Sequence, residues 1–157
     1  MSSRKTIGPQ IAGWREWAAL PDFGLTHINA KMDTGAKTSS LHATHIRDFV
    51  CDGETWVSFR LAPRQRSTKG AIDCKALVLD ERTVKSSSGH EEHRVVIETA
   101  IGLGRFMTKV EVTLTDRTDM TFRMLIGRRT MRQFGLMIDT THSYLLGEPA
   151  LPKETVR

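Results

Sequence analysis

A short stretch, residues 26–41, constrains the fold of this chain more than any other part of it. From Thr26 to Met32 apolar residues alternate with polar ones, which predicts a strand with one face toward the core. The strand ends at Asp33-Thr34-Gly35-Ala36, where Gly35 can adopt backbone conformations that are closed to residues with a Cβ. Such a turn points the Asp33 carboxylate away from the sheet. A chance Asp-x-Gly turn is the alternative, because the bare tripeptide is common.

The rest of the chain has the pattern of many short strands and one helix. Asp52-Gly53 is a strong hairpin signal, and residues 128–134 form the predicted helix, with Gly135 placed to cap its end. This pattern predicts a mainly β fold, a small closed β-barrel with one short C-terminal helix. The further strands are predicted over residues 14–20, 39–49, 55–61, 74–80, 94–101, 106–115, 121–126 and 143–146.

Length and composition fit one small cytoplasmic domain. With 157 residues and a formal net charge of +5, we expect a single domain over residues 1–157, with flexible ends at 1–10 and 148–157. The basic excess suits an anionic partner or a solvated surface. The sequence has neither the apolar run of a signal peptide nor a stretch that could span a bilayer, and Cys51 and Cys74 form no CxxC pair. We therefore expect reduced thiols, a cytoplasmic location and no membrane partner.

Two features resemble the active-site architecture of the pepsin and retropepsin aspartic proteases. The first is the apolar strand that leads into Asp33-Thr34-Gly35-Ala36. The second is Met124-Leu125-Ile126-Gly127, which in that family passes behind the catalytic loop and opens a short helix. The longer pattern is similar to a bacterial retropepsin-like family that carries the name ATP-dependent zinc protease, over about residues 7–147. The matching stretches are residues 13–17, 30–43, 86–89, 112–115 and 124–128.

The resemblance implies a catalytic aspartate that works as one of a pair. Such enzymes hold a water molecule between two carboxylates that share one proton. This chain has a single Asp-Thr-Gly, since Asp139-Thr140-Thr141 lacks the glycine. The resemblance therefore implies a homodimer in which the two Asp33 residues meet and the predicted strand at 143–146 interleaves with its partner. The implied site residues are Asp33, Thr34 and Gly35 for catalysis, Ala36, Lys37, Thr38 and Ser39 for substrate binding, and Ile126, Gly127 and Arg128 for support of the loop.

A hairpin that closes over the substrate is also implied, between the strands predicted at 55–61 and 94–101. This long interval is basic, and the alternative for its tip is a disordered surface loop. Viral retropepsins usually carry acidic residues where this chain has Lys37 and Thr38, so Arg128 lacks its usual carboxylate. We hypothesise acidic, glutamate-rich protein substrates and a link to an ATP-grasp glutamate ligase; a solvated Lys37 is the alternative. The basic residues of the interval are Arg64, Arg66, Lys69, Arg82 and Lys85.

Three other functions are open. His90-Glu91-Glu92-His93 suggests a zinc peptidase, but a zinc helix needs His-Glu-x-x-His and a third ligand, so we expect no metal. No GxxxxGK[ST] loop is present, so we expect no nucleotide cofactor either. A binding module that kept the barrel and lost catalysis is a second possibility. Nucleic-acid binding through Arg128, Arg129 and Arg132 is not expected, because no aromatic residues interleave that cluster.

Overall fold

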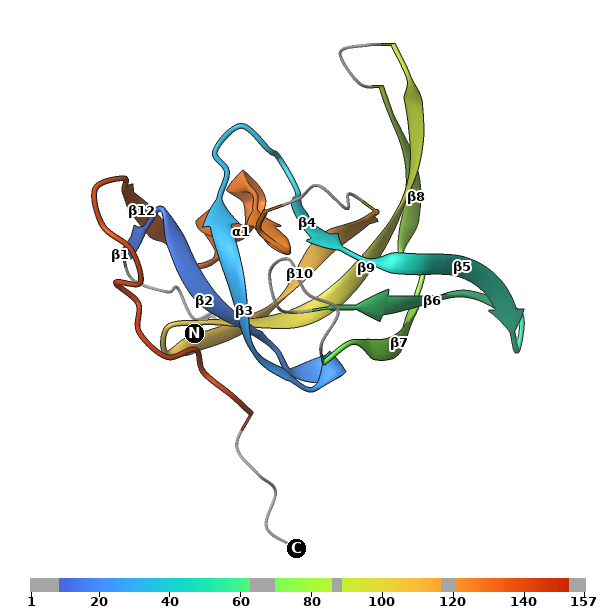
Figure 1. The fold of residues 1–157 in the computed structure, drawn as a ribbon, viewed down its shortest axis with the longest axis horizontal. Coiled ribbons are helices and arrows are strands. Elements are labelled where there is room, and N and C mark those ends of the chain that lie inside the picture. The colour runs from blue at the N-terminus through green and yellow to red at the C-terminus, as the bar shows by residue number, and fades with distance from the viewer. Residues whose placement is uncertain (1–8, 63–69, 86–88, 117–120, 153–157) are drawn as a thin grey trace, which may run out of the picture.

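The computed structural model describes residues 9–62, 70–85, 89–116 and 121–152, and they form a mainly β fold (Figure 1). The α-helix of the described residues, α1, is Arg128–Gln133, and a 3₁₀ helix, η1, is Pro21–Phe23. The strands are β1 Gln10–Gly13, β2 Arg15–Leu20, β3 Leu25–Met32, β4 Ser39–His42, β5 Thr44–Cys51, β6 Glu54–Leu61, β7 Ile72–Leu77, β8 Asp80–Lys85, β9 Glu91–Leu103, β10 Phe106–Thr115, β11 Met124–Ile126 and β12 Leu136–Asp139.

Six of these strands close into a barrel, which confirms the predicted fold class. They lie in the order β10-β4-β11-β3-β2-β9, and β9 pairs with β10 to complete the circle. Most pairs are antiparallel, but β4 runs parallel to β10 and β3 runs parallel to β11. The parallel β3–β11 pair ends with Met32 opposite Ile126, so the turn after Met32 and the turn after Ile126 emerge side by side.

The barrel interior is filled by the apolar residues that alternate along these strands. Ile28, Ala30 and Met32 are buried along β3, as predicted, and Val110, Val112 and Leu114 are buried along β10. Fully burying a side chain of this size contributes about 1.5–3 kcal/mol. The predicted alternation of β10 holds only in part, because Thr113 on the other face is buried as well and its hydroxyl donates to the Ser39 carbonyl at 3.4 Å.

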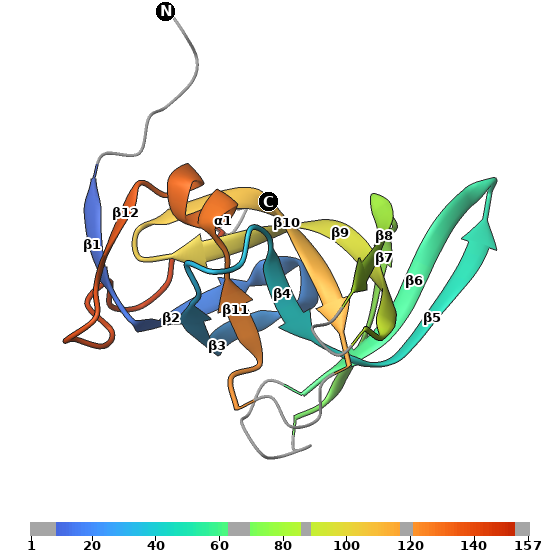
Figure 2. The same cartoon turned by 90° about the horizontal axis from the view of Figure 1, so that it is seen from above.

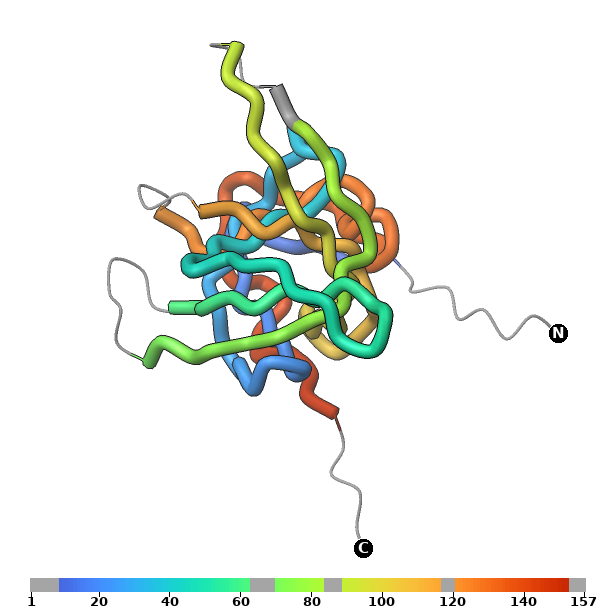
Figure 3. Tube along the Cα trace, turned by 90° about the vertical axis from the view of Figure 1, so that its right-hand side faces the viewer, coloured from blue at the N-terminus to red at the C-terminus, as the bar shows by residue number. Residues whose placement is uncertain are grey.

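A second sheet of three strands, β5-β6-β7, extends from the barrel. The predicted hairpin turn between β5 and β6 is confirmed, with Asp52 at φ 52° and Gly53 at φ 77°, the signs that a tight two-residue turn requires. The prediction of a single strand over 39–49 is wrong, because the strand is interrupted at Ala43 between β4 and β5. The N–H of Ala43 donates to the Thr115 carbonyl at 3.0 Å. In Figure 3 this sheet lies toward the viewer, and the β8–β9 hairpin rises above it.

The C-terminal part differs most from the prediction. Residues 143–146 do not form a strand, and the last strand is β12, which pairs in parallel with β1. The carboxylate of Glu16, completely buried, accepts hydrogen bonds from the N–H groups of Leu145 at 2.8 Å and Leu146 at 3.1 Å. The same carboxylate accepts from the N–H of Gly13. The segment is therefore bound within its own chain, and it cannot interleave with a partner while these contacts hold.

The ends of the described chain are tied to the barrel. Gln10, expected to be a loose lead-in, starts β1 opposite Leu136, and the N–H of Ala150 donates to the Gly104 carbonyl at 2.7 Å. Figure 2 shows β1, β12 and α1 at one end of the molecule and the β5–β6 hairpin at the other. Cys51 is exposed and Cys74 is buried, and both are free. Among the described residues, no helix is both long and apolar enough to cross a membrane.

Candidate active site

Asp33 lies in the turn that follows β3, at the mouth of the barrel. Its N–H donates to the Ile126 carbonyl at 2.9 Å, and its carbonyl accepts from the N–H of Ala36 at 3.2 Å. Its carboxylate Oδ1 accepts from the N–H of Gly35 at 3.0 Å. The side chain is half-buried, and Thr34 and Gly35 beside it are exposed. The turn thus orients a carboxylate whose site remains open to solvent.

The backbone of Gly35 differs from the prediction. Its φ angle does not lie in the left-handed region. A Cβ at this position would instead come within 3.2 Å of Asp33 Oδ1, tighter than ordinary van der Waals contact. A side chain at position 35 would therefore crowd the Asp33 carboxylate, which would have to shift by a few tenths of an ångström.

The segment that joins β11 to α1 supports the turn from behind. The N–H groups of Arg128 and Arg129 donate to the carbonyls of Ala36 at 2.8 Å and Lys37 at 3.1 Å. A Cβ on Gly127 would lie 2.6 Å from the carbonyl carbon of Thr38, so only glycine allows this approach. The three predicted support residues, Ile126, Gly127 and Arg128, thus all contact the 33–39 loop.

The predicted substrate-binding residues fall into two groups. Lys37 is exposed, and Ala36 and Thr38 are half-buried, so all three reach the surface near Asp33. Ser39 is completely buried. Its hydroxyl accepts from the N–H of Gly127 at 3.0 Å and shares a hydrogen bond of 2.6 Å with Thr130. The structure therefore places Ser39 in the support of the loop and away from the surface that a substrate can reach.

The β8–β9 hairpin is an arm that rises on the same side of the molecule as the 33–39 loop (Figure 1). Arg82 on β8 donates to Glu111 Oε1 on β10 at 3.0 Å, and Arg129 on α1 donates to the same oxygen at 3.5 Å. Glu111 thus joins the hairpin to the helix that supports the loop. Of the other basic residues predicted in this region, Arg64, Arg66 and Lys69 lie outside the described residues, as do the serine turn at 86–88 and the side chain of Lys85.

Comparison with known proteins decides the family. The profile of the RimB-like family, described as "Retropepsin-like aspartic endopeptidase RimB", matches residues 11–149. The chain belongs to this family. A crystal structure of a Legionella pneumophila protein of unknown function superposes with a TM-score of 0.73 at 28% identity, covering 87% of this chain and 97% of that one.

Curated relatives of this RimB-like chain carry the name "Probable alpha-L-glutamate ligase". The protein from Shewanella pealeana is 47% identical over 138 residues, which are 88% of this chain and 30% of the relative. That from Desulfotalea psychrophila is 42% identical over 142 residues, 90% of this chain and 30% of the relative. The chain thus spans about 30% of the length of these relatives. The expected retropepsin-like family is confirmed, but these relatives are named as ligases and not as zinc proteases.

The residues first considered for zinc have a different arrangement in this RimB-like chain. Glu91, Glu92 and His93 lie on strand β9, so they alternate between its faces and do not form a helical ligand pair. His93 Nε2 lies 3.4 Å from Glu81 Oε1, and Asp48 completes a group whose ligand atoms lie within 4.8 Å of one another. Partial desolvation at the surface and a hydrogen bond with Glu81 raise the pKa of Asp48. All three side chains are exposed, and their contacts with one another explain the grouping.

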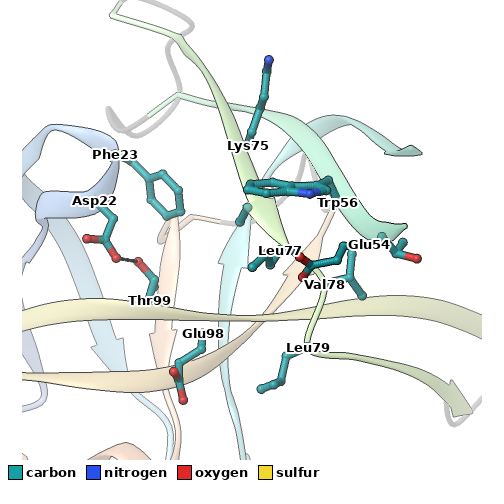
Figure 4. Close-up of a pocket in the computed structure, with 12 residues that line it drawn as sticks. Asp22, Phe23, Glu54, Trp56, Lys75, Leu77, Val78, Leu79, Glu98 and Thr99 are labelled. Atoms are coloured by element: carbon teal, nitrogen blue, oxygen red, sulfur yellow. Dashed lines mark hydrogen bonds between the residues drawn. The ribbon is translucent and has the colours of Figure 1, made fainter. Parts of the chain in front are cut away.

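A cavity of about 600 Å³ opens at the other end of β3 (Figure 4). Phe23 and Trp56 flank it, and Asp22 accepts a hydrogen bond of 2.9 Å from Thr99 at its edge. The eight residues of β3 separate it from Asp33, a distance of roughly 26 Å at the usual strand rise. This cavity is therefore separate from the aspartate turn.

Two acidic residues of this RimB-like chain were missed at the sequence level. Glu16 follows Trp14 and precedes Ala18 and Leu20 on the inward face of a predicted strand, and a charge in that apolar row was a usable signal. Glu111 lies between two valines, which is the ordinary pattern of a surface residue on a strand. Nothing in the sequence therefore indicated that two arginines contact it.

Proposed function

We propose that this chain is an aspartic-type peptidase that hydrolyses peptide or isopeptide bonds in acidic protein segments. The observation that carries the proposal is the Asp33 turn, held at the open end of the barrel by Ile126, Gly127 and Arg128 in a member of a retropepsin-like family. A barrel serving only as a scaffold has no need to brace an aspartate that stays accessible to solvent.

The chemistry requires two such carboxylates, and one chain supplies one. We infer a homodimer in which Asp33 of each copy contacts one water molecule, because two carboxylates about 3 Å apart share a single proton. The unprotonated carboxylate accepts a proton from water as the water attacks the substrate carbonyl, and the protonated one donates to the carbonyl oxygen. The pair titrates as a unit, so its pKa values belong to both residues.

The β1–β12 pair is the surface that we expect the second copy to contact. Within the chain, Leu145 and Leu146 are bound to Glu16 and Tyr144 is bound to the Arg15 carbonyl, which leaves the β1–β12 pair as the outermost strands at that end. Ile11 and Met137 are register partners in this pair, and they are 58% and 61% exposed. An exposed two-stranded edge with apolar side chains is prone to pair with another chain. We therefore expect this sheet to form part of the dimer contact.

Acidic substrates agree with the surroundings of Asp33. Lys37, Arg128 and Arg129 are exposed around the turn, and basic residues near a cleft favour anionic segments. The relatives named "Probable alpha-L-glutamate ligase" contain this domain within a longer chain. A peptidase that removes glutamates is a chemical counterpart to a ligase that adds them, so we infer a functional link to an ATP-grasp glutamate ligase.

The ligase name of the relatives favours one alternative, a barrel that binds the ligase's acidic product without cleaving it. A cleavage assay separates the two. Wild type and Asp33→Asn are incubated from acidic to neutral pH with glutamate-rich and lysine-rich peptides, and products are read by mass spectrometry. We expect wild type alone to cleave, with the glutamate-rich peptide preferred. Cleavage that survives Asp33→Asn contradicts the aspartic mechanism, and binding without cleavage by wild type supports the binding module.

A further inference from the structure

A second cavity, of about 360 Å³, lies beside the aspartate turn between α1 and β10. Thr38 lines it next to the turn, Arg129 and Arg132 line it from α1, Lys109 and Glu111 line it from β10, and Glu98 lines it from β9. We call it the flank cavity. Its volume lies in the range that accommodates small ligands, so a single extended side chain fits within it.

The flank cavity is structurally continuous with the 33–39 loop. The N–H of Arg129 donates to the Lys37 carbonyl at 3.1 Å, and Ser39 pairs with Val112, the residue after Glu111. Arg82, on the β8 arm of the hairpin, reaches the cavity wall through Glu111. A peptide that lies between the hairpin and the aspartate turn therefore passes the mouth of this cavity.

Positive charge is in excess at this cavity. The lining contains three cations, Lys109, Arg129 and Arg132, against two carboxylates. One carboxylate, Glu111, is already engaged by Arg82 and Arg129. Within the ranges that the structure describes, neither Lys109 nor Arg132 has a carboxylate within 4.0 Å. Their charges are free to meet a ligand.

Arg129 is the cation best placed to select a carboxylate. Among the described residues, its guanidinium makes one contact with an acceptor, the 3.5 Å contact with Glu111, and its side chain is 49% exposed. A guanidinium offers several donors in a planar fork that matches a carboxylate, and fixing one end of the fork orients the rest. Glu111 fixes that end, and Arg82 in turn fixes Glu111 from the hairpin.

We propose that the flank cavity is a subsite for an acidic side chain of the substrate, in which Arg129 contacts the carboxylate and Glu111 is the positioning residue that orients Arg129. This subsite rests on the proposed peptidase function and names the residues that select its substrate. Because the cavity lies beside the turn and not over Asp33, the acidic side chain that it holds is at some distance along the peptide from the bond that is cleaved.

Binding to the Asp33→Asn chain tests the subsite without any cleavage. The probes are a glutamate-rich peptide and the same peptide with every glutamate changed to glutamine, and calorimetry gives the two dissociation constants. We expect Arg129→Gln, added to Asp33→Asn, to weaken binding of the glutamate peptide about tenfold, in line with the loss of a charge-assisted contact, and to leave the glutamine peptide unchanged. The matched control is Arg105→Gln, because Arg105 is an exposed arginine in the turn after β9, away from the cavity.

Cleavage kinetics then distinguish positioning from a general structural role. In the active chain, we expect Glu111→Gln to raise KM for the glutamate peptide several-fold with kcat little changed, and to raise KM for the glutamine peptide much less. Equal losses in Arg129→Gln and Arg105→Gln would mean long-range attraction and would overturn the subsite, as would equal losses for both peptides. Intact, Arg129-dependent binding in a wild-type chain that cleaves neither peptide would remove the peptidase proposal and leave the subsite in place.

Discussion

The Arg128 guanidinium donates a hydrogen bond of 2.8 Å to the carbonyl of Thr34, in the turn that carries Asp33. In viral retropepsins the resembling arginine meets acidic residues of the loop, and here Lys37 and Thr38 stand in those places. Arg128 therefore makes a hydrogen bond to a backbone carbonyl where the viral enzymes have an ion pair. Any residue at position 34 would provide this carbonyl. This contact of Arg128 is thus independent of the side chains at positions 37 and 38.

Removing that contact should loosen the aspartate turn. We expect Arg128→Ala to lower the free energy of unfolding by about 1 kcal/mol, as for one hydrogen bond from a charged donor at an exposed site, and to reduce kcat/KM more than stability. Arg128→Lys keeps the charge but lacks the planar fork, so it should restore little. Urea unfolding and peptide cleavage measure the two effects. An Arg128→Ala chain with wild-type kcat/KM would show that the turn holds its shape without this contact.

The close approach at Gly127 should not tolerate a side chain. A Cβ there would lie 2.6 Å from the Thr38 carbonyl carbon, which is backbone and cannot move aside. We expect Gly127→Ala to cost about 1–3 kcal/mol of stability, the usual range for overpacking, together with most of the activity. Gly53→Ala is the control, because its Cβ would meet no atom within 4 Å and only its positive φ is strained. Thermal unfolding should show the larger loss for Gly127→Ala.

Glu16 should be the most sensitive acidic residue for stability. It is completely buried and accepts from three N–H groups, those of Gly13, Leu145 and Leu146. Glu16→Gln replaces one acceptor oxygen with a donor facing an N–H, so we expect a loss of about 2–4 kcal/mol. Hydrogen exchange should speed up at Leu145 and Leu146 in particular. Exposed Glu54→Gln is the control; equal stability of the two variants would contradict the anchoring role of Glu16.

The two cysteines should differ sharply in reactivity. Burial, and after it the nearby Asp73 carboxylate, raise the pKa of the Cys74 thiol to about 11, whereas Cys51 is exposed. A pKa about two units above the ordinary value reduces the fraction of Cys74 present as reactive thiolate about 100-fold near pH 8. Iodoacetamide should therefore label Cys51 first. The raised pKa of Cys74 also means that the unfolded chain loses its proton first, so this residue's contribution to stability falls as pH rises from 9 toward 11. Rapid labelling of a folded Cys51→Ser chain would contradict the burial of Cys74.

The sequence was informative where local pattern and local structure agree. The strand into Asp33, the Asp52-Gly53 turn and the short helix before Gly135 depend on alternation, turn chemistry and capping, which neighbouring residues determine. The glycine before the helix was also predicted to lie behind the aspartate turn, and it does so because only glycine permits the contact with Thr38.

The sequence was less informative where distant segments decide the structure. Residues 143–146 were predicted as a strand, yet the Glu16 carboxylate binds the N–H groups of Leu145 and Leu146, and the Arg15 carbonyl binds that of Tyr144. Both partners lie more than a hundred positions earlier in the chain. Ser39 was predicted to bind substrate, but its hydroxyl is hydrogen-bonded to the hydroxyl of Thr130 and the N–H of Gly127. The junction of Arg82, Glu111 and Arg129 joins three elements that no local pattern connects.

The parallel pairing of β3 with β11 has a consequence for synthesis in the cell. Ala30 and Lys31 lie opposite Met124 and Leu125, about ninety positions later, and contacts between such remote segments form late in folding. A growing chain that ends before Met124 lacks β11 and the Ile126 carbonyl to which the Asp33 N–H donates. The support of the aspartate turn can therefore form only after residues 124–128 have been synthesised, about ninety positions after the turn itself.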